Sequence, residues 1–269
     1  MKLEGPGNGI SFSYLEDFMN FHRLFKFFPV VAVALGLSAD DLYLGQTPEK
    51  YLMGDYNGGK VHKVFVNKIE KSSFRMRPDV MAAFQKMIEA YDKDRKGKSN
   101  EHIFVRSGFR SYADQKYIWE TKFTGKRKMR ESVEGKKPEE IVSLILQYSS
   151  APGTSRHHWG TDIDINSFDN TYFEKGGKGE FLYSWLQENA SKFGFCQPYN
   201  EYSKRGEKGY YLERWHWSYK PVSSKLEKEW QKAYQSKKII IKGKFMGSNT
   251  MSDDLPLTYV TSVNTDCKE

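Results

Sequence analysis

The residues best suited to chemistry lie in two short segments, one reading Ser-Arg-His-His-Trp-Gly-Thr-Asp-Ile-Asp and the other Glu-Arg-Trp-His. His157 and Asp164 come from the first segment and His216 from the second. Two imidazoles and a carboxylate are ligand types that zinc prefers, and a catalytic zinc keeps three protein ligands and one open position. Glu213, three residues before His216, is suitably placed to take a proton from a water molecule that the metal acidifies. The pattern therefore predicts a zinc hydrolase.

These two segments resemble the Ser-x-His-x-x-Gly...Asp and Glu-x-Trp-His motifs of the VanY/VanX-type zinc D-Ala-D-Ala peptidases. A third segment, Val-Arg-Ser-Gly-Phe-Arg-Ser-Tyr-Ala-Asp-Gln, is similar to the Ser-Gly-Tyr-Arg-Ser segment that precedes the metal motif in VanY-like enzymes. Its second arginine is Arg110. The three matching segments occur along this chain in the same order as in the family. The resemblance implies a zinc D-alanyl-D-alanine carboxypeptidase with one Zn2+ per chain, held by His157, Asp164 and His216.

The resemblance also implies roles for four further residues. Glu213 would be the general base, although a salt bridge to Arg214 is the structural alternative. Arg110 would stabilise the oxyanion as the peptide carbonyl becomes tetrahedral, or would be a surface ion-pair partner. Ser155 and Gln115 would hydrogen-bond the terminal carboxylate of the substrate, or would cap local backbone.

Two residues near the motif leave their roles open. Many relatives have a small residue two places before the ligand aspartate, where this chain has Asp162. We expect Asp162 to put a second carboxylate near the metal, where it would disfavour an anionic substrate terminus. His158 follows a ligand in a segment that we expect to be extended, so its side chain would point away and serve a structural role.

The composition is that of a soluble globular chain of 269 residues, with 38% hydrophobic and 15% aromatic residues. This content is sufficient for a substantial core. The formal net charge of +8 raises nucleic acid as an alternative partner. However, the basic residues are scattered apart from short clusters at 126–128 and 136–137. A solvated basic surface is the favoured interpretation, and we expect no nucleic-acid partner.

The first 39 residues are interpreted as an upstream extension plus a signal peptide. Residues 27–37 form an uncharged apolar run, preceded by Arg23 and Lys26, that is too short to span a bilayer. We expect translation to start at Met19 and cleavage to occur between Gly36 and Asp40. A buried N-terminal helix is the alternative. The remaining domain, 40–269, would then be exported to the periplasm or cell wall, without stable membrane insertion.

The only cysteines are Cys196 and Cys267. Export would permit a disulfide between them, but their spacing alone does not decide whether they pair.

Alternating helical and strand-like patterns in residues 40–269 predict one α+β domain. In 161–165, Asp162 and Asp164 share one face of a strand, and the isoleucines share the other. The strand-like composition of 210–219 requires a bulge or turn before Glu213 and His216 can meet. The resemblance implies a small antiparallel sheet covered by helices on one side, as in hedgehog/DD-peptidase-like folds. We expect helices at 78–96, 111–121, from 138, 181–193 and from 224, and strands at 102–105, 161–165, 210–219 and 238–242.

Together these features predict an exported carboxypeptidase that removes the terminal D-Ala from D-Ala-D-Ala ends of peptidoglycan stem peptides. An L,D-carboxypeptidase or a peptidoglycan endopeptidase would use the same chemistry on another bond. A non-catalytic zinc-stabilised binding domain, as in hedgehog-type proteins, is the alternative from another class. Oligomeric state is left open.

Overall fold

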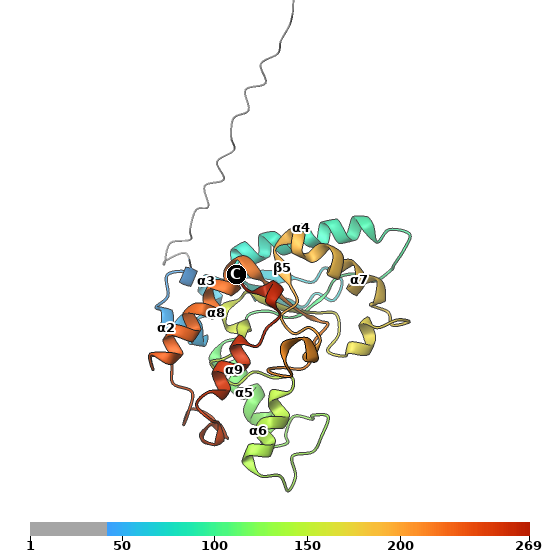
Figure 1. Cartoon of the computed structure of the whole chain (residues 1–269). Helices are drawn as coiled ribbons and strands as arrows, with labels where there is room; N and C mark the ends of the chain where they lie inside the picture. Colours follow the sequence, from blue (N-terminus) through green and yellow to red (C-terminus); the bar gives the residue numbers. More distant parts are fainter. Residues whose placement is uncertain (1–41) are drawn as a thin grey trace, which may run out of the picture. The chain divides into compact units, whose positions relative to one another are not determined.

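The computed structural model describes residues 42–269, so the predicted start site and signal peptide lie outside the described residues. The described chain is a mixed α and β domain, in agreement with the predicted fold class (Figure 1). Its strands are β1 (Lys63–Val66), β2 (Ser73–Met76), β3 (Val105–Ser107), β4 (Asp162–Ile165), β5 (Phe195–Cys196) and β6 (His216–Tyr219). Its α-helices are α2 (Pro48–Met53), α3 (Gly58–Val61), α4 (Pro78–Asp94), α5 (Tyr112–Phe123), α6 (Pro138–Leu146), α7 (Glu180–Asn189), α8 (Lys220–Gln235) and α9 (Leu255–Thr261). Its 3-10 helices are η1 (Arg156–Trp159), η2 (Asn170–Phe173), η3 (Ala190–Phe193), η4 (Tyr202–Arg205), η5 (Ser248–Thr250) and η6 (Thr265–Cys267).

The central sheet has four antiparallel strands in the order β3-β4-β6-β5, which confirms the predicted antiparallel arrangement. In the pairing of β4 with β6, Asp164 lies opposite His216 and Asp162 lies opposite Ser218. Directly opposed residues project from the same face of a sheet. The register therefore places Asp164 beside His216 before any side-chain contact is considered.

The other face of the sheet is apolar. Ile163 and Ile165 of β4 and Trp217 of β6 are buried in a core with residues of α4 and α7, including Phe84 and Leu182. Figure 1 shows α4 and α7 together at one end of the fold, with α5 and α6 at the opposite end. A second core joins α5 and α6 to the C-terminal helices α8 and α9. It includes Trp119 of α5, Ile145 of α6, Trp230 of α8 and Val260 of α9.

Several predicted boundaries are wrong. The last long helix begins at Lys220, where Pro221 occupies the first turn, and Ser224 bonds to the Lys220 carbonyl inside the helix. Residues 238–242 do not form a strand, because the backbone N–H groups of Lys238 and Ile239 donate to the Ala233 carbonyl at the end of α8. The segment is nevertheless anchored, since Ile239 is buried.

The predicted strand at 102–105 begins only at Val105. At the start of β3, side chains accept hydrogen bonds from the backbone N–H groups. Asn166 Oδ1 accepts from Phe104 N, and Asn67 Oδ1 accepts from Val105 N. The predicted strand at 210–219 is reduced to His216–Tyr219. The β1–β2 hairpin was not predicted, and both of its strands are largely exposed.

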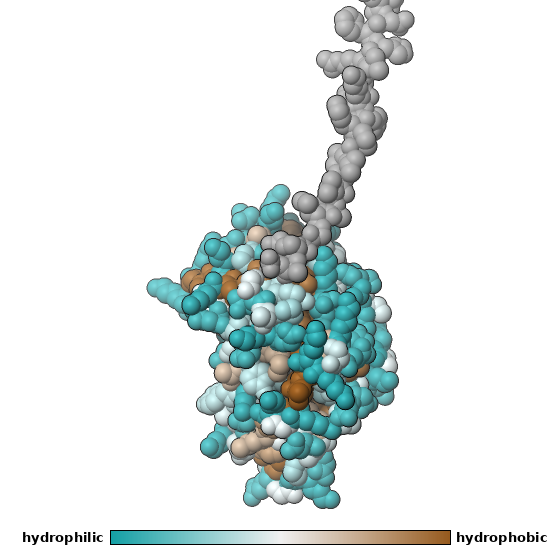
Figure 2. All heavy atoms as spheres, turned by 90° about the vertical axis from the view of Figure 1, so that its left-hand side faces the viewer, coloured by the Kyte–Doolittle hydropathy of each residue, from teal (hydrophilic) through white to brown (hydrophobic). Residues whose placement is uncertain are grey.

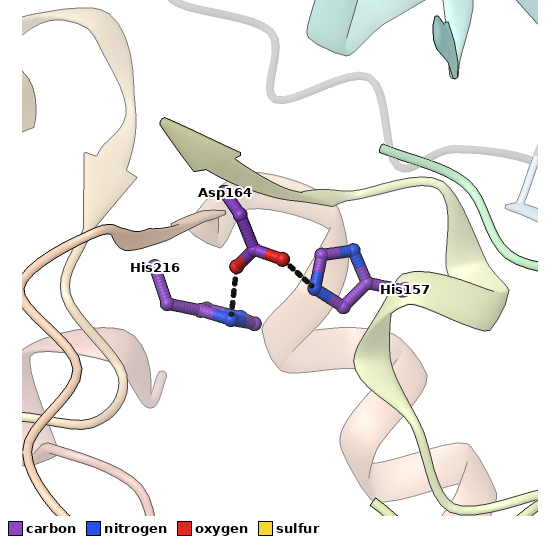
Figure 3. A group of neighbouring side chains, drawn as sticks. All are labelled: His157, Asp164 and His216. Carbon is purple, nitrogen blue, oxygen red and sulfur yellow. Dashed lines mark ion pairs between the residues drawn. The ribbon is translucent and has the colours of Figure 1, made fainter. Parts of the chain in front are cut away.

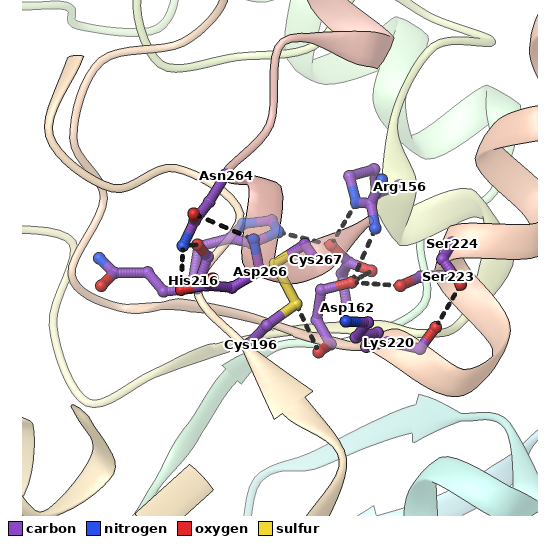
Figure 4. The surroundings of a disulfide bond; sticks show 12 residues. Arg156, Asp162, Cys196, His216, Lys220, Ser223, Ser224, Asn264, Asp266 and Cys267 are labelled. Carbon is purple, nitrogen blue, oxygen red and sulfur yellow. Dashed lines mark hydrogen bonds and ion pairs between the residues drawn. A yellow bond between two sulfur atoms is a disulfide. The ribbon is translucent and has the colours of Figure 1, made fainter. Parts of the chain in front are cut away.

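Cys196 and Cys267 form a disulfide, which resolves the pairing that the sequence left open. The bond links β5, at the edge of the sheet, to η6 near the C-terminus (Figure 4). The C-terminal segment is thereby held against the sheet.

The surface seen in Figure 2 is mainly hydrophilic, with scattered hydrophobic residues. Scattered apolar residues are normal on the surface of a folded protein. Among residues 42–269, no helix is both long and apolar enough to cross a bilayer.

Candidate metal centre and catalytic cleft

His157, Asp164 and His216 come together in the fold, and one potential ligand atom from each lies within 4.8 Å of the others. His157 is carried by η1, Asp164 by β4 and His216 by β6 (Figure 3). Asp164 lies between the two rings, with Oδ2 3.2 Å from His157 Nε2 and Oδ1 2.9 Å from His216 Nδ1. All three side chains are buried.

The His157 ring is oriented by a backbone contact. Its Nδ1 lies 2.8 Å from the Gly108 carbonyl oxygen and donates to it, so Nε2 is left to face Asp164. Gly108 belongs to the Ser-Gly-Phe-Arg segment, and a Cβ there would lie 2.4 Å from the Arg75 carbonyl oxygen. Only glycine fits this approach to β2. The glycine in that motif thus supports the imidazole through its backbone.

Three carboxylates surround the His216 ring, one at Nε2 and two at Nδ1. Asp162 Oδ2 lies 2.8 Å from Nε2, while Nδ1 faces Asp164 and lies 3.4 Å from Glu213 Oε2. Asp162 is therefore behind the imidazole and does not line the cleft. The expectation that Asp162 would disfavour an anionic substrate terminus is wrong, because its charge is buried and compensated.

That compensation comes mainly from Arg156, which is fully buried (Figure 4). Its guanidinium donates to Asp162 Oδ2 at 3.1 Å, to Glu227 Oε2 at 2.8 Å and to Ser218 Oγ at 2.9 Å. Burial by itself would raise the pKa of Asp162, but Arg156 and His216 hold it well below its ordinary value. Asp162 therefore stays ionised and accepts a hydrogen bond from His216 Nε2.

The donor atoms fit a divalent cation. His157 Nε2 and Asp164 Oδ1 are buried and have no hydrogen-bond partner of acceptable geometry among the described residues. Burial, reinforced by Arg110, lowers the pKa of His157, which favours the neutral imidazole that a metal requires. Burial opposes a charge on His216, yet Asp164 and its other carboxylate neighbours raise its pKa well above the ordinary value. The centre thus favours positive charge, and its two imidazoles and one carboxylate suit zinc.

Glu213 reaches this centre from the turn that precedes β6. The turn closes with a bond from His216 N to the Glu213 carbonyl, and Glu213 N donates to the Tyr199 carbonyl at 2.9 Å. A bulge or turn between Glu213 and His216 was predicted from the sequence, and the structure has a turn there. Glu213 is 5% exposed, and burial raises the pKa of its carboxyl group. A buried carboxylate with a raised pKa, facing a cleft, is chemically suited to act as a general base.

Arg110 lies on the loop between β3 and α5, and its backbone is held by η1. Its N–H donates to the His157 carbonyl at 3.2 Å, and its own carbonyl accepts from His158 Nδ1 at 2.7 Å. Its guanidinium donates to Gln115 Oε1 at 3.0 Å and lies 3.7 Å from Asp164 Oδ2. The positive group is thus positioned beside the candidate metal centre.

His158 serves the structural role expected of it, although its segment is a 3-10 helix and not extended. The ring is fully buried, donates to Arg110 through Nδ1, and accepts from Gly153 N through Nε2 at 3.0 Å.

The structure does not place Gln115 or Ser155 on the cleft wall. Gln115 is fully buried, and its amide donates to the Ser150 carbonyl while its oxygen accepts from Arg110. In this structure it contacts Arg110 and local backbone, and its role toward a substrate carboxylate stays a prediction. Ser155 is also fully buried, and its Oγ has no hydrogen-bond partner among the described residues.

A cleft of approximately 840 Å³ opens above the centre and is lined by His157, Asp164, Glu213, His216 and Arg110. Sequence reasoning missed most of its walls, because aromatic and basic residues are common in cores and on surfaces. The one available signal was Trp215, which stands inside the second motif. The additional lining residues include Tyr148, Phe168, Tyr199, Tyr210, Trp215, Lys122, Arg127, Lys128 and Arg130.

Comparison with known proteins places these residues in a family. A family model described as VanY: D-alanyl-D-alanine carboxypeptidase matches residues 73–222, more than half of the 269-residue chain. A D-alanyl-D-alanine carboxypeptidase of Enterococcus faecalis is 33% identical over 116 residues, covering 43% of this chain and 39% of that protein. One from Enterococcus faecium is 25% identical over 148 residues, covering 55% of this chain and 38% of that protein. The matched segments are therefore about two fifths of these relatives.

Among solved structures, VanYB in complex with D-Alanine-D-Alanine is 23% identical, with a TM-score of 0.46, covering 66% of this chain and 85% of that one. A Zn(II) complex of a mutant of the vancomycin resistance D,D-pentapeptidase VanY is 23% identical, with a TM-score of 0.45, covering 62% of this chain and 83% of that one. The family match spans all three candidate ligands and Glu213. The chain belongs to the VanY D-alanyl-D-alanine carboxypeptidase family.

Proposed function

We propose that this protein is an exported zinc carboxypeptidase that removes the terminal D-Ala from D-Ala-D-Ala ends of peptidoglycan stem peptides. One observation carries the proposal: the candidate ligands, the buried carboxyl of Glu213 and the guanidinium of Arg110 line a single cleft. Membership of the VanY family and the name shared by the two enterococcal relatives support the substrate class.

In this proposal His157, Asp164 and His216 hold one zinc ion. When bound, zinc polarises the scissile carbonyl and lowers the pKa of water. Glu213 takes a proton from the attacking water as its oxygen bonds to the carbonyl carbon, and then delivers that proton to the leaving nitrogen as the C–N bond breaks. Arg110 stabilises the negative charge that develops on the carbonyl oxygen. The products are the shortened peptide and free D-Ala.

Export is part of the proposal and is supported by the Cys196–Cys267 disulfide, because such bonds persist mainly in oxidising compartments. The N-terminal segment is expected to be removed by cleavage between about Gly36 and Asp40. Intact-mass measurement of the protein from its native host tests this, and a mature chain that keeps residues 19–39 would contradict it.

The activity is tested by mass spectrometry of the products from defined stem peptides. The substrates are a pentapeptide ending in D-Ala-D-Ala, a tetrapeptide and a cross-linked dimer. Release of one D-Ala from the pentapeptide should dominate, and chelation should stop it until zinc is restored. Preferred cleavage of the tetrapeptide would indicate an L,D-carboxypeptidase, and preferred cleavage of the dimer would indicate an endopeptidase.

Variants separate metal binding from chemistry. His216→Ala should lose zinc and activity together. Glu213→Gln should retain zinc and lose at least about a hundredfold in rate, and Arg110→Ala should retain zinc and lose about two to three orders of magnitude. Glu201→Gln, on the exposed Glu201, is the matched control. Parent-like turnover in both the Glu213 and Arg110 variants would exclude this mechanism, and peptide binding without turnover in the parent would favour a binding domain.

A further inference from the structure

The turn that carries Glu213 is held at its backbone by residues 197–199, which follow β5 and are called the β5 connection below. Glu213 N donates to the Tyr199 carbonyl at 2.9 Å, and Gln197 Nε2 donates to the Glu213 carbonyl at 3.1 Å. Tyr183 donates to Gln197 Oε1 at 2.9 Å, which leaves Nε2 to face Glu213. Gln197 and Tyr199 are both buried. The β5 connection therefore fixes both backbone hydrogen-bonding groups of Glu213.

The β5 connection is itself held by the C-terminal segment, which comprises Asn264 and η6. Asn264 N donates to the Pro198 carbonyl at 2.8 Å, and Asn264 Nδ2 donates to the Gln197 carbonyl at 3.2 Å. Directly before the connection, Cys196 is bonded to the fully buried Cys267 (Figure 4). Two hydrogen bonds and one covalent bond thus link the C-terminal segment to the backbone that supports Glu213.

The two ends of this link differ in their relation to the family. Gln197 and Glu213 lie inside the matched residues 73–222, whereas Asn264 and Cys267 lie outside them. The support of Glu213 thus includes a part of the chain beyond the family match.

Other contacts keep the turn folded and hold the metal ligand independently. Asn170 Nδ2 donates to the Leu212 carbonyl at 2.8 Å, and Arg214 N donates to Asn170 Oδ1 at 3.0 Å. His216 is fixed by the pairing of β4 with β6. Loss of the C-terminal link should therefore move Glu213 relative to the metal centre and leave the ligands in place. A displacement of about 1 Å at a catalytic group can lower a rate by about a hundredfold.

We propose that the C-terminal segment positions Glu213 for proton transfer, through Asn264 and the Cys196–Cys267 disulfide. Asn264 and the disulfide hold the β5 connection, and the connection holds Glu213. This inference rests on the proposed carboxypeptidase function, in which Glu213 is the base. It adds positioning residues that do not line the cleft.

The test uses two variants that weaken the link at different points. Asn264→Ser keeps an acceptor that can cap η6 but is too short to reach the Gln197 carbonyl. Cys196→Ser/Cys267→Ser removes the covalent bond. In each variant, kcat for the pentapeptide ending in D-Ala-D-Ala should fall about 5- to 10-fold, as expected for a lost hydrogen bond and a small displacement. KM and zinc content should stay at the parent values.

Asn189→Ser is the matched control. Asn189 is also half-buried and donates through Nδ2 to a backbone carbonyl, that of Trp185, which is not part of the β5 connection. Thermal unfolding establishes that each variant is folded at the assay temperature. A parent-like kcat in either link variant, or a loss of zinc in step with the rate, would overturn the inference.

A second measurement distinguishes the positioning of Glu213 from a general loss of structure. Asn264→Ser is introduced into Glu213→Gln, whose residual rate no longer depends on a placed base. There the substitution should have no further effect, because the effects of residues that act as a unit are not additive. The same fold-loss in both backgrounds would refute a role through Glu213.

The failure of the proposed function would be seen separately, as an absence of hydrolysis by the parent. In that case amide hydrogen exchange still decides whether the C-terminal segment holds Glu213. The amides of Glu213 and His216 donate to the carbonyls of Tyr199 and Glu213, so they should exchange faster in Asn264→Ser than in the parent and in Asn189→Ser. Unchanged exchange at Glu213 would contradict the inference.

Discussion

Asp162 Oδ2 lies 2.8 Å from Nε2 of His216, on the side of the imidazole away from the candidate metal centre. The other ring nitrogen faces Asp164. A carboxylate behind a ligating histidine fixes the tautomer and orientation of the ring and increases its basicity. In this chain the carboxylate is buried and is held by the Arg156 guanidinium. Asp162 is thus a positioning residue for His216.

Replacing Asp162 with asparagine should weaken zinc binding by about 10- to 100-fold, because the support for His216 loses its charge. Competition with a chromophoric chelator measures the dissociation constant on protein shown to be folded. Asp253→Asn is the control, since Asp253 is an exposed partner of Lys242. An unchanged zinc affinity in Asp162→Asn would mean that this carboxylate serves only the Arg156 cluster.

Gln115 is predicted to act through Arg110 and not on the substrate. Gln115→Leu removes the acceptor that holds the guanidinium, so kcat should fall about tenfold while KM and zinc content change little. The measurement is steady-state kinetics with the free-acid pentapeptide and its amide. Gln187→Leu, at an exposed position on α7, is the control. If Gln115→Leu instead loses the preference for the acid over the amide, Gln115 contacts the terminal carboxylate after all.

The disulfide should make a measurable contribution to stability. It closes a loop with a sequence separation of 71 residues. Constraint of the unfolded chain by a loop of this size contributes up to about 4 kcal/mol to the free energy of unfolding. Urea unfolding with and without reductant measures the difference. The double variant Cys196→Ser/Cys267→Ser should be insensitive to reductant, and a parent midpoint equally insensitive to reductant would rule out this contribution.

Much of the metal centre follows from the sequence. The alternation of Asp162, Ile163, Asp164 and Ile165 predicts a strand with both aspartates on one face, and the sheet has this arrangement. The separation of Glu213 from His216 requires a turn, and a turn is present. These features depend on local periodicity, which a sequence displays directly.

Other features depend on contacts between distant segments. Asp162 and Asp164 are equivalent by strand pattern, and only the pairing of β4 with β6 directs them to opposite nitrogens of His216. Gln115 and Lys122 share a helix, yet the fold turns the first toward Arg110 and leaves the second on the cleft wall, without an acidic partner in the part of the chain that the structure describes. The sequence by itself determined the candidate ligand types, the candidate base and the strand that presents Asp164. The tertiary structure decided which charges are compensated inside the protein and which remain available to a substrate, because compensation is a property of neighbours in space.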